Sequence, residues 1–385
     1  MNNFVFQNPV ELIFGRGQIA RLADHVAGGT RILMTYGGGS IKRNGVYDQV
    51  MAALKDCDIV EFGGIEANPD YDTLMKAVEI CRTQKIDMII AVGGGSIIDG
   101  TKFIAAAARY EGGDAWQLLA GGAEVKDALP FATVLTLPAT ASEMNCGAVI
   151  SRRATKEKYA FGSSLLFPKF SILDPTTVYS LPNRQIANGV VDIYAHTLEQ
   201  YLTTSNHTRV MDRWAEGLLH TLIEVAPRLM KEGERSYDDC ADFMLTATMG
   251  LNGFIAMGVD EDWATHMIGH ELTALHGLDH GVTLAMVYPG VMHVMRREKE
   301  AKLLQYAERI WGISEGSADE RIDKAIRCTS EFFASVGMKL HLSDYGIGEE
   351  TVRTITDRFR QRGWNVGENH IVTPDKVEEI LRYIM

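Results

Sequence analysis

Histidine and carboxylate side chains gather at two places in the second half of the chain. Four of the eleven histidines fall within fifteen residues: His266, His270, His276 and His280. Asp192 and His196 lie four residues apart in a segment with helical periodicity, so their side chains share one helix face about 6 Å apart. Imidazoles together with a carboxylate suit Zn²⁺ or Fe²⁺ and could also hold Mn²⁺, Co²⁺ or Ni²⁺. The two groups predict a divalent metal site that acts as a Lewis acid.

The spacing leaves the third histidine ligand open between His270 and His280. His266 and His270 are four residues apart, which is the simplest pairing on a helix. His266 and His280 would lie about 21 Å apart along a continuous helix. They could share an ion only if the helix breaks between them, and Gly277 and Gly281 supply residues for such a break.

Two Gly-Gly-Gly-Ser turns, at residues 37–40 and 93–96, each follow a predicted strand. A strand that ends in glycines and runs into a helix presents backbone N–H groups to an anion, and the helix dipole adds to the attraction. In the second turn we expect Ser96 to be the helix N-cap and Asp99 to complete a capping box. The glycines would let a pyrophosphate approach the backbone closely. Neither turn matches the GxGxxG or the Walker A pattern.

The first turn indicates which dinucleotide would bind. Sites that prefer NAD usually place an acidic residue after the strand, where it contacts the ribose hydroxyls. This chain has Gly37 there, followed by Ser40, Lys42 and Arg43. A hydroxyl and two cations favour an extra phosphate, which a carboxylate would repel. The sequence therefore predicts NADP(H) rather than NAD(H).

The elements that must position these residues change in type near residue 181. Before it, short apolar runs alternate with helical patterns, which is typical of a parallel sheet covered by helices. The predicted strands are 31–36, 58–62, 87–92, 131–137 and 171–173, and the predicted helices are 44–56, 70–84 and 97–110. After it, every periodic segment is helical: 184–202, 207–230, 238–258, 262–275, 281–296, 299–311, 318–336, 348–362 and 374–384. We therefore expect an α/β dinucleotide-binding domain at 1–181 and an all-helical metal-binding domain at 182–385.

The composition of the 385 residues is that of an ordinary globular protein, 46% hydrophobic and 23% charged, with a formal net charge of −12. An acidic chain without a basic stripe is a poor partner for nucleic acid or for an anionic membrane. No apolar run reaches the roughly 20 residues of a membrane helix, and the N-terminus does not have the pattern of a signal peptide. The five cysteines are widely spaced, which favours free thiols and a cytoplasmic location over a disulfide framework.

A series of motifs follows in order along essentially the whole chain. They are Phe14-Gly-Arg-Gly17, Gly93–Lys102, Thr136–Thr140 with Ser142 and Asn145, Asp192 with His196, His266–Leu272, His280-Gly281 and Gly367–Asn369. These motifs resemble the iron-containing (group III) alcohol dehydrogenases. The segments 36–40 and 263–280 are most similar to the branch of NADPH-dependent butanol dehydrogenases and broad-range aldehyde reductases. The resemblance implies a dehydroquinate synthase-like fold, with an α/β N-terminal nucleotide-binding domain and an all-α C-terminal domain, and a homodimer.

The resemblance also implies roles for individual residues. The metal ligands would be Asp192, His196, His266 and His280. His270 would then be a non-ligand that relays a proton. The cofactor residues would be Gly37, Gly38, Gly39, Ser40 and Lys42 at the first turn, Gly94, Gly95, Ser96 and Asp99 at the second, and Thr136, Thr140, Asn145 and Lys158 beyond them.

The implied activity is the reduction of short to medium aldehydes to primary alcohols by NADPH, with Fe²⁺ or Zn²⁺ polarising the carbonyl oxygen. An apolar lining expected near Phe254, Met257, Trp263 and Met267 favours simple aldehydes as the small-molecule substrates. A polyol (glycerol-type) dehydrogenase or a dehydroquinate-synthase-like lyase is the alternative on the same fold, and either needs a polar, cation-rich pocket. A metal hydrolase is less favoured because it does not need two phosphate-binding turns, and a non-catalytic NADP-binding sensor is the remaining alternative.

Overall fold

Buried apolar runs form a six-stranded parallel sheet in the computed structural model, which describes residues 1–203 and 208–385. The strands of the sheet are β1 (Glu11–Phe14), β2 (Arg31–Tyr36), β3 (Asp58–Phe62), β4 (Met88–Gly94), β5 (Phe131–Leu137) and β8 (Phe170–Leu173). Their order is β1-β8-β5-β4-β2-β3, and each neighbouring pair is parallel. Strands β6 (Gly147–Arg152) and β7 (Glu157–Gly162) form a separate antiparallel hairpin.

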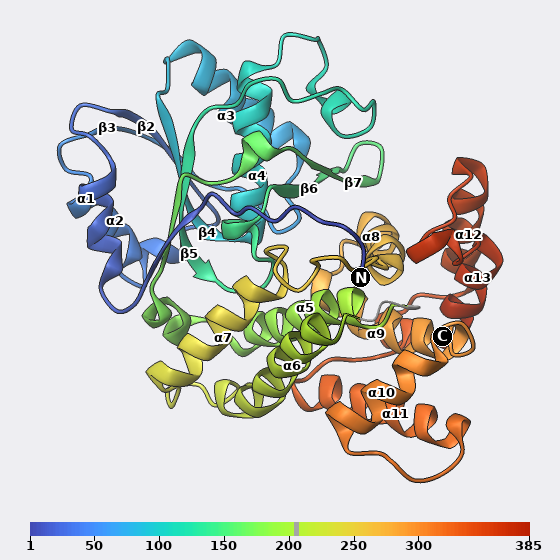
Figure 1. Ribbon diagram of the computed structural model, residues 1–385. Coiled ribbons are helices and arrows are strands. Elements are labelled where there is room, and N and C mark those ends of the chain that lie inside the picture. Colours follow the sequence, from blue (N-terminus) through green and yellow to red (C-terminus); the bar gives the residue numbers. More distant parts are fainter. Residues whose placement is uncertain (204–207) are drawn as a thin grey trace. The chain divides into compact units, whose positions relative to one another are not determined.

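Helices cover both faces of the sheet (Figure 1). They are α1 (Leu22–His25), α2 (Val46–Ala53), α3 (Tyr71–Thr83) and α4 (Gly95–Arg109). Ile32 and Met34 of β2 point into an apolar core that they share with α1 and α2. On the other face, the hydroxyls of Thr35 and Thr101 are hydrogen-bonded at 2.7 Å, which joins β2 to α4. Since β2 and β4 are neighbours, the glycine turns that follow them lie at the same edge of the sheet.

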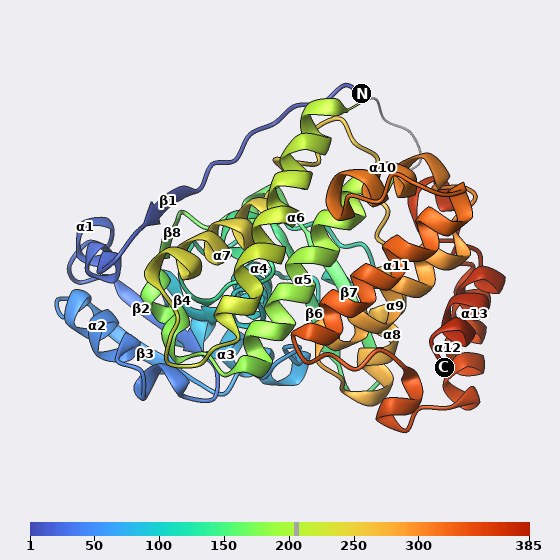
Figure 2. The ribbon, with the colours of Figure 1, turned by 90° about the horizontal axis from the view of Figure 1, so that it is seen from below.

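The remainder of the described chain is helical. The helices are α5 (Asn183–Tyr201), α6 (Arg209–Leu229), α7 (Tyr237–Gly250), α8 (Ala264–His276), α9 (His280–Val294), α10 (Glu300–Trp311), α11 (Ala318–Ser335), α12 (Glu349–Arg362) and α13 (Pro374–Tyr383). Helix α5 packs between α6 and α9, and α11 packs against both α9 and α10 (Figure 2). Buried side chains of α8, α9, α12 and α13 form one apolar core. In the described parts of the chain, no helix is both long enough and apolar enough to span a membrane.

The described residues divide into two compact units, which we name by their main content. The sheet unit comprises Gln7–Pro182 and Glu232–Asn252. The helical unit comprises Met1–Phe6, Asn183–Lys231 and Gly253–Met385. Helix α7 thus lies in the sheet unit, where the Thr248 hydroxyl donates to the Glu143 carboxylate at 2.6 Å. Helical periodicity alone places α7 with the other helices of the predicted domain 182–385, because a contact such as that between Thr248 and Glu143 joins residues that are remote in sequence.

Each predicted strand and helix is present, with ends shifted by up to one turn, except the helix at 238–258. That helix ends at Gly250, and Gly253 and Gly258 adopt left-handed φ values of 86° and 69°, which a continuing helix excludes. The predicted first residue of the helix at 207–230 lies outside the described residues. Strands β1, β6 and β7 were not predicted, because β1 has only four residues and the hairpin strands alternate between buried and exposed positions too weakly to be recognised.

Candidate functional site

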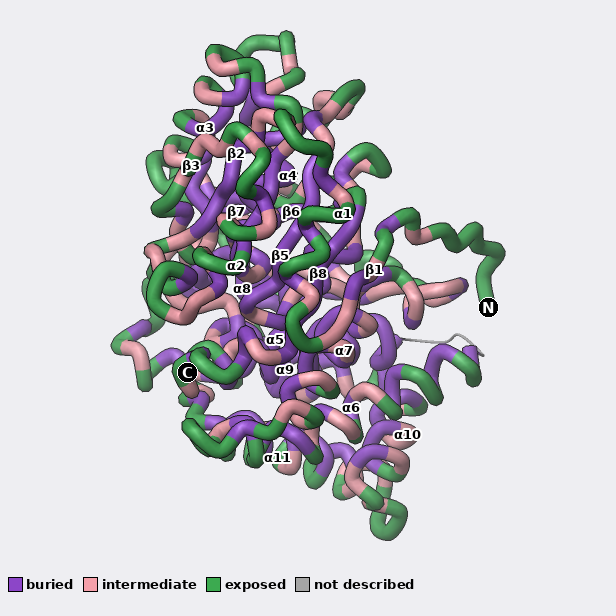
Figure 3. Tube along the Cα trace, turned by 90° about the vertical axis from the view of Figure 1, so that its left-hand side faces the viewer, coloured by how far each residue is buried: buried purple, intermediate pink, exposed green. Residues whose placement is uncertain are grey.

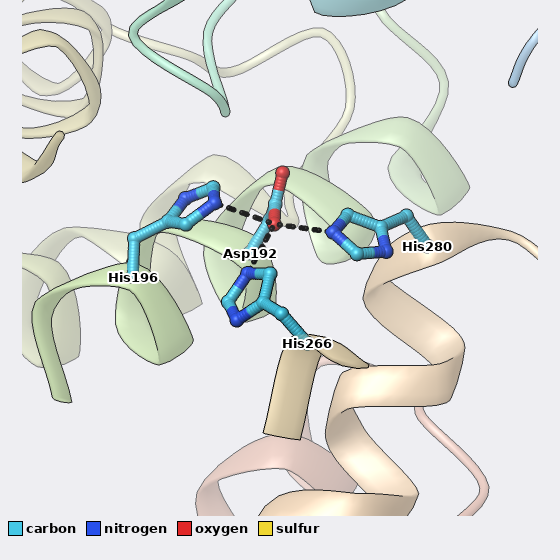
Figure 4. A group of neighbouring side chains, drawn as sticks. All are labelled: Asp192, His196, His266 and His280. Atoms are coloured by element: carbon cyan, nitrogen blue, oxygen red, sulfur yellow. Dashed lines mark ion pairs between the residues drawn. The ribbon is translucent and has the colours of Figure 1, made fainter. Parts of the chain in front are cut away.

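One carboxylate and three imidazoles converge in the helical unit. His196 Nε2 and His280 Nε2 each lie 3.6 Å from Asp192 Oδ1, and His266 Nε2 lies 4.0 Å from it. Figure 4 shows the three rings pointing toward this carboxylate. Asp192, His196 and His266 are buried, whereas the His280 side chain is 22% exposed. We call these four residues the metal-binding group.

Three helices supply the group. Asp192 and His196 lie one turn apart on α5, on the shared face that their spacing predicted. His266 lies in the first turn of α8, which ends at His276 with Gly277 in the left-handed conformation at φ 67°. Helix α9 then begins at His280. The predicted helix break is therefore confirmed, and it allows His280 to approach a carboxylate that a straight helix could not reach.

The other two clustered histidines lie outside the group. The His270 ring is centred 5.3 Å from the His280 ring and 6.4 Å from the His266 ring. It is 8% exposed, so it lies beside the metal-binding group in a nearly dry environment. His276 lies at the other end of α8, where its Nε2 is 2.9 Å from the Thr351 hydroxyl.

Glu199 supports the group and was not predicted. Its Oε1 accepts a hydrogen bond from the His266 backbone N–H at 3.2 Å and lies 3.1 Å from His266 Nδ1. A proton held on Nδ1 leaves the lone pair of Nε2 free to bind a metal ion, as in many metal sites. Burial, followed by the Asp262 carboxylate, raises the pKa of Glu199. The sequence held a sign of this role, since Glu199 follows Asp192 by seven residues and His196 by three on one helix face.

The donor atoms fit a divalent ion. All four lie within 4.8 Å of one another. Ligands at about 2.0–2.2 Å around a tetrahedral ion are separated by about 3.4 Å. The observed separations of 3.6–4.0 Å from Asp192 would need only small closing movements. Three imidazole nitrogens and one carboxylate oxygen suit Zn²⁺ or Fe²⁺.

The second glycine turn brings β4, α4 and the segment after β5 into close contact. An added Cβ on Gly93 would lie 2.3 Å from an Ile97 atom, and one on Gly95 would lie 2.4 Å from the Thr140 hydroxyl. Gly94 would likewise meet Leu137 at 2.9 Å. These positions exclude side chains, so backbone is left at the N-terminus of α4. A helix N-terminus of this kind attracts phosphate.

The expected capping box at this helix is wrong. The N-cap residue is Gly94, and no side chain caps α4. The Ser96 hydroxyl instead accepts a hydrogen bond from the Asn68 backbone N–H at 3.3 Å. The Asp99 carboxylate accepts from the Ser142 hydroxyl at 2.6 Å and from the Val149 N–H at 2.9 Å. Asp99 therefore holds a neighbouring segment, because buried donors of the tertiary fold outcompete the local cap.

In Asn145, a predicted cofactor residue, both the nitrogen and the oxygen of the side-chain amide are hydrogen-bonded within the protein. Its Nδ2 donates to the carbonyls of Thr140 and Leu251 at 3.1 Å each. Its Oδ1 accepts from Lys102 Nζ at 2.8 Å and from the Gly147 N–H at 3.2 Å. Burial lowers the pKa of Lys102 to about 8, although the Asp99 carboxylate opposes the shift.

Asn68 links two predicted cofactor residues and was missed in the sequence. Besides its contact with Ser96, its Oδ1 accepts from Lys158 Nζ at 2.9 Å. Asn68 has a left-handed φ of 54° and precedes Pro69, so an Asn-Pro turn was the available sign. Thr136 and Lys158 are 8% and 7% exposed, and both lie in the sheet unit with the two glycine turns.

At the first turn, Gly39 adopts φ 87° and a short 3-10 helix, η2 (Ser40–Lys42), follows it. Lys42 Nζ donates to Glu61 Oε2 at 2.9 Å and lies over the rings of Tyr36 and Tyr47. The hydrogen bond from Lys42 lowers the pKa of Glu61. Gly37 and Gly38 have no side chain, and a Cβ on Gly38 would meet no atom within 4 Å.

Comparisons with known proteins cover both units. Residues 9–175 match the family described as iron-containing alcohol dehydrogenase, and residues 186–385 match the C-terminal part of the same family. The chain is 54% identical over 378 residues to the NADPH-dependent aldehyde reductase YqhD of Escherichia coli, with 97% of each chain covered. It is 43% identical over 387 residues to the probable NADH-dependent butanol dehydrogenase 1 of Bacillus subtilis, with 99% of each covered.

Solved structures agree with these matches. The crystal structure of Escherichia coli K-12 YqhD superposes with a TM-score of 0.97 at 52% identity, covering 100% of this chain and 99% of that one. The NADH-dependent butanol dehydrogenase A of Thermotoga maritima gives a TM-score of 0.95 at 38% identity, with 100% and 99% covered. An α/β N-terminal part followed by an all-helical C-terminal part is thus confirmed as the fold class. The chain belongs to the iron-containing alcohol dehydrogenase family, as its motifs indicated.

Proposed function

We propose that this protein is a metal-dependent aldehyde reductase that uses NADPH to convert short to medium aldehydes into primary alcohols. The observation that carries the proposal is the convergence of Asp192, His196, His266 and His280 in a member of this family. A relative that is 54% identical is named an NADPH-dependent aldehyde reductase, which supports both the substrate class and the cofactor.

The metal-binding group would hold Fe²⁺ or Zn²⁺, and a divalent ion bound there supplies Lewis-acid polarisation of a carbonyl oxygen. Three of its four ligands are buried, which limits the access of water, and charge stabilisation is stronger in such a site. His270 is placed beside His280 and can deliver a proton from a ring nitrogen to the product oxygen. The rings of Trp263 and His266 are centred 5.0 Å apart in a T-shaped arrangement. Trp263 thus supplies apolar surface next to the group, which suits a simple aldehyde.

The two glycine turns of the sheet unit would bind the dinucleotide. Gly94, Gly95 and Ser96 offer the N-terminus of α4 to the pyrophosphate, and NADPH supplies hydride when bound. Gly37 carries no carboxylate, and Lys42 is held near this turn by Glu61, Tyr36 and Tyr47. This arrangement supports a preference for the 2′-phosphate of NADPH. The relative from Bacillus subtilis is named NADH-dependent, so the preference must be measured in this chain.

The test is NADPH oxidation by the purified protein with butanal. It compares the protein as isolated, after chelation, and after Fe²⁺ or Zn²⁺ is added back, with NADH in parallel assays. We expect turnover that chelation abolishes and metal restores, and that is faster with NADPH at limiting cofactor. Turnover that persists without metal contradicts the role of the metal-binding group, and turnover only with NADH contradicts the role of the first turn.

The assembly and location of the protein complete the proposal. A homodimer is supported by apolar side chains that remain exposed near the N-terminus: Met1, Phe4, Val5 and Phe6, of which Val5 is 97% exposed (Figure 3). A cytoplasmic location is supported by the five cysteines, all of which are free thiols. Light scattering on the purified protein and on Val5→Lys tests the dimer, since a charge in an apolar interface should raise the monomer fraction.

A further inference from the structure

Lys299 is a buried cation in the helical unit. Only 3% of it is exposed. Its Nζ donates to the Leu202 carbonyl at 2.6 Å and to Asp262 Oδ2 and Glu368 Oε1 at 2.7 Å each. All three ammonium protons thus have acceptors, and these come from the end of α5, the loop before α8 and the segment before α13. Burial by itself would lower the pKa of Lys299. The two carboxylates outweigh the effect of burial, so that the pKa is raised overall.

Asp262 passes this anchoring on to the helices that carry the metal-binding group. Its Oδ1 accepts from the Ala264 N–H at 3.0 Å, which fixes the first turn of α8. Its own backbone N–H donates to the Glu199 carbonyl at 2.9 Å, which ties the same loop to α5. His266 lies two residues after Ala264. The carboxylate that Lys299 neutralises therefore sets how α8 begins relative to α5.

Glu199 contacts the proposed metal ligand His266 directly. Its carboxylate accepts a hydrogen bond from the His266 backbone N–H and lies next to His266 Nδ1. The contacts thus run from Lys299 through Asp262 and Glu199 to His266. Each member except His266 is less than 5% exposed, and His266 is 5% exposed. Carboxylates buried at such density repel one another unless a cation lies between them.

Glu368 is brought to Lys299 by a strained turn. Gly367, Asn369 and His370 have φ values of 76°, 54° and 56°. Two non-glycine residues in the left-handed region cost free energy, and such strain persists where the fold requires it. A Cβ on Gly367 would lie 3.0 Å from a Val372 atom and 3.2 Å from Asp262 Oδ2. The motif Gly367–Asn369 is thus shaped to place one carboxylate on Lys299.

We propose that Lys299 is a positioning residue of the metal-binding group, acting through Asp262 on the first turn of α8 and so on His266. The inference rests on the proposed role of that group in holding a divalent ion. Lys299 contacts neither substrate nor ligand atoms. It holds together the buried carboxylates of Asp262 and Glu368, whose mutual repulsion would otherwise displace the loop before α8.

The chain offers a matched control on the same helix. Lys302, three residues later, is also buried, at 7% exposure, and its Nζ pairs with Asp212 Oδ1 at 2.5 Å. Lys302 Nζ also lies 5.0 Å from the centre of the Tyr201 ring, at the C-terminal end of α5. Among the described residues it has no hydrogen bond to Asp262, Glu199 or His266. Lys299→Met and Lys302→Met therefore both remove a buried ion pair from one end of α10, and both should lower the melting temperature.

The test measures Co²⁺ binding by competition with a chelator, together with the visible absorption of the bound Co²⁺. We expect Lys299→Met to raise the Kd for Co²⁺ by about 10–100-fold and to change the absorption bands, because the support of a ligand is lost. Lys302→Met should leave both unchanged although it lowers the melting temperature. An unchanged Kd and spectrum in Lys299→Met would overturn the proposal, as would an equal loss in Lys302→Met.

Asp262→Ala keeps the test decisive if Lys299→Met does not fold. It leaves a neutral pair of Lys299 and Glu368 and removes the link to Ala264. The same rise in Kd is expected, and an unchanged Kd would overturn the proposal. If the unmutated protein binds Co²⁺ and loses it in His280→Ala, the metal role stands whatever Lys299→Met does. If the unmutated protein binds no divalent ion, both the proposed function and the positioning role of Lys299 are wrong.

Discussion

His280 Nε2 lies 3.6 Å from the Asp192 carboxylate, whereas the His270 ring lies beside His280 and outside the metal-binding group. The two histidines should therefore respond differently to substitution. His280→Ala should lose bound metal and activity together. His270→Ala should keep the metal and lose about 100-fold or more in kcat, the usual contribution of a proton-transfer group. Metal analysis of the purified variants, with steady-state kinetics, checks both; metal retained in His280→Ala and lost in His270→Ala would reverse the assignment.

Gly37 is the residue whose missing side chain should decide between the two dinucleotides. An added Cβ would lie 3.4 Å from the Ile65 carbonyl and from Ile97 Cδ1, so a small side chain fits with close contact. Gly37→Asp should lower the ratio of kcat/KM for NADPH to that for NADH by about fivefold or more, because two close negative charges repel by at least about 1 kcal/mol even in water. Gly37→Asn has the same shape without the charge and is the control. A ratio that falls equally in both variants would indicate a steric cause.

At the scale of elements, the junction of β4 and α4 combines tight packing with a proposed binding role. Gly95→Ala would place a methyl group 2.4 Å from the Thr140 hydroxyl and 2.5 Å from its methyl group. We expect it to destabilise the protein by about 1–3 kcal/mol, as overpacking does, and to weaken NADPH binding. Denaturant unfolding and cofactor titration measure the two effects.

Gly217→Ala in α6 is the matched control for that substitution. Gly217 is exposed in a helix, and its added Cβ would meet no atom within 4 Å. Alanine there should stabilise the protein by about 0.5–1 kcal/mol through helix propensity and leave cofactor binding unchanged. Equal responses of Gly95→Ala and Gly217→Ala would show that the turn tolerates side chains.

For the molecule as a whole, a metal bound by three helices should stabilise the unit that they form. Helices α5, α8 and α9 each contribute to the metal-binding group. An ion that binds only the folded state at 100 times its Kd adds about 2.7 kcal/mol to the free energy of unfolding. Chelation should therefore lower the melting temperature, and adding Zn²⁺ or Fe²⁺ should restore it. Calorimetry measures this shift, and His280→Ala should melt at the same temperature with and without metal.

The chain by itself determined those features that depend on neighbours in sequence. Continuous apolar runs indicated the central strands, period 3.6 indicated the helices, and the GGGS turns stood at the ends of β2 and β4 as expected. Asp192 and His196 share a face because four residues make about one helical turn. Gly277 and Gly281 also marked where a helix could break. All of these are short-range effects of backbone geometry and side-chain spacing.

Only the tertiary structure decided which remote residues meet. Spacing alone could not separate His270 from His280, because the choice depends on where α9 begins relative to α5. Asp99 bonds to Ser142 and Val149 rather than capping α4, since tertiary donors are available to it. The hydrogen bonds around Lys299 connect Glu199, through Asp262, with Glu368. These residues lie up to 169 positions apart in the sequence. Such contacts depend on burial and chain topology, which local sequence patterns do not encode.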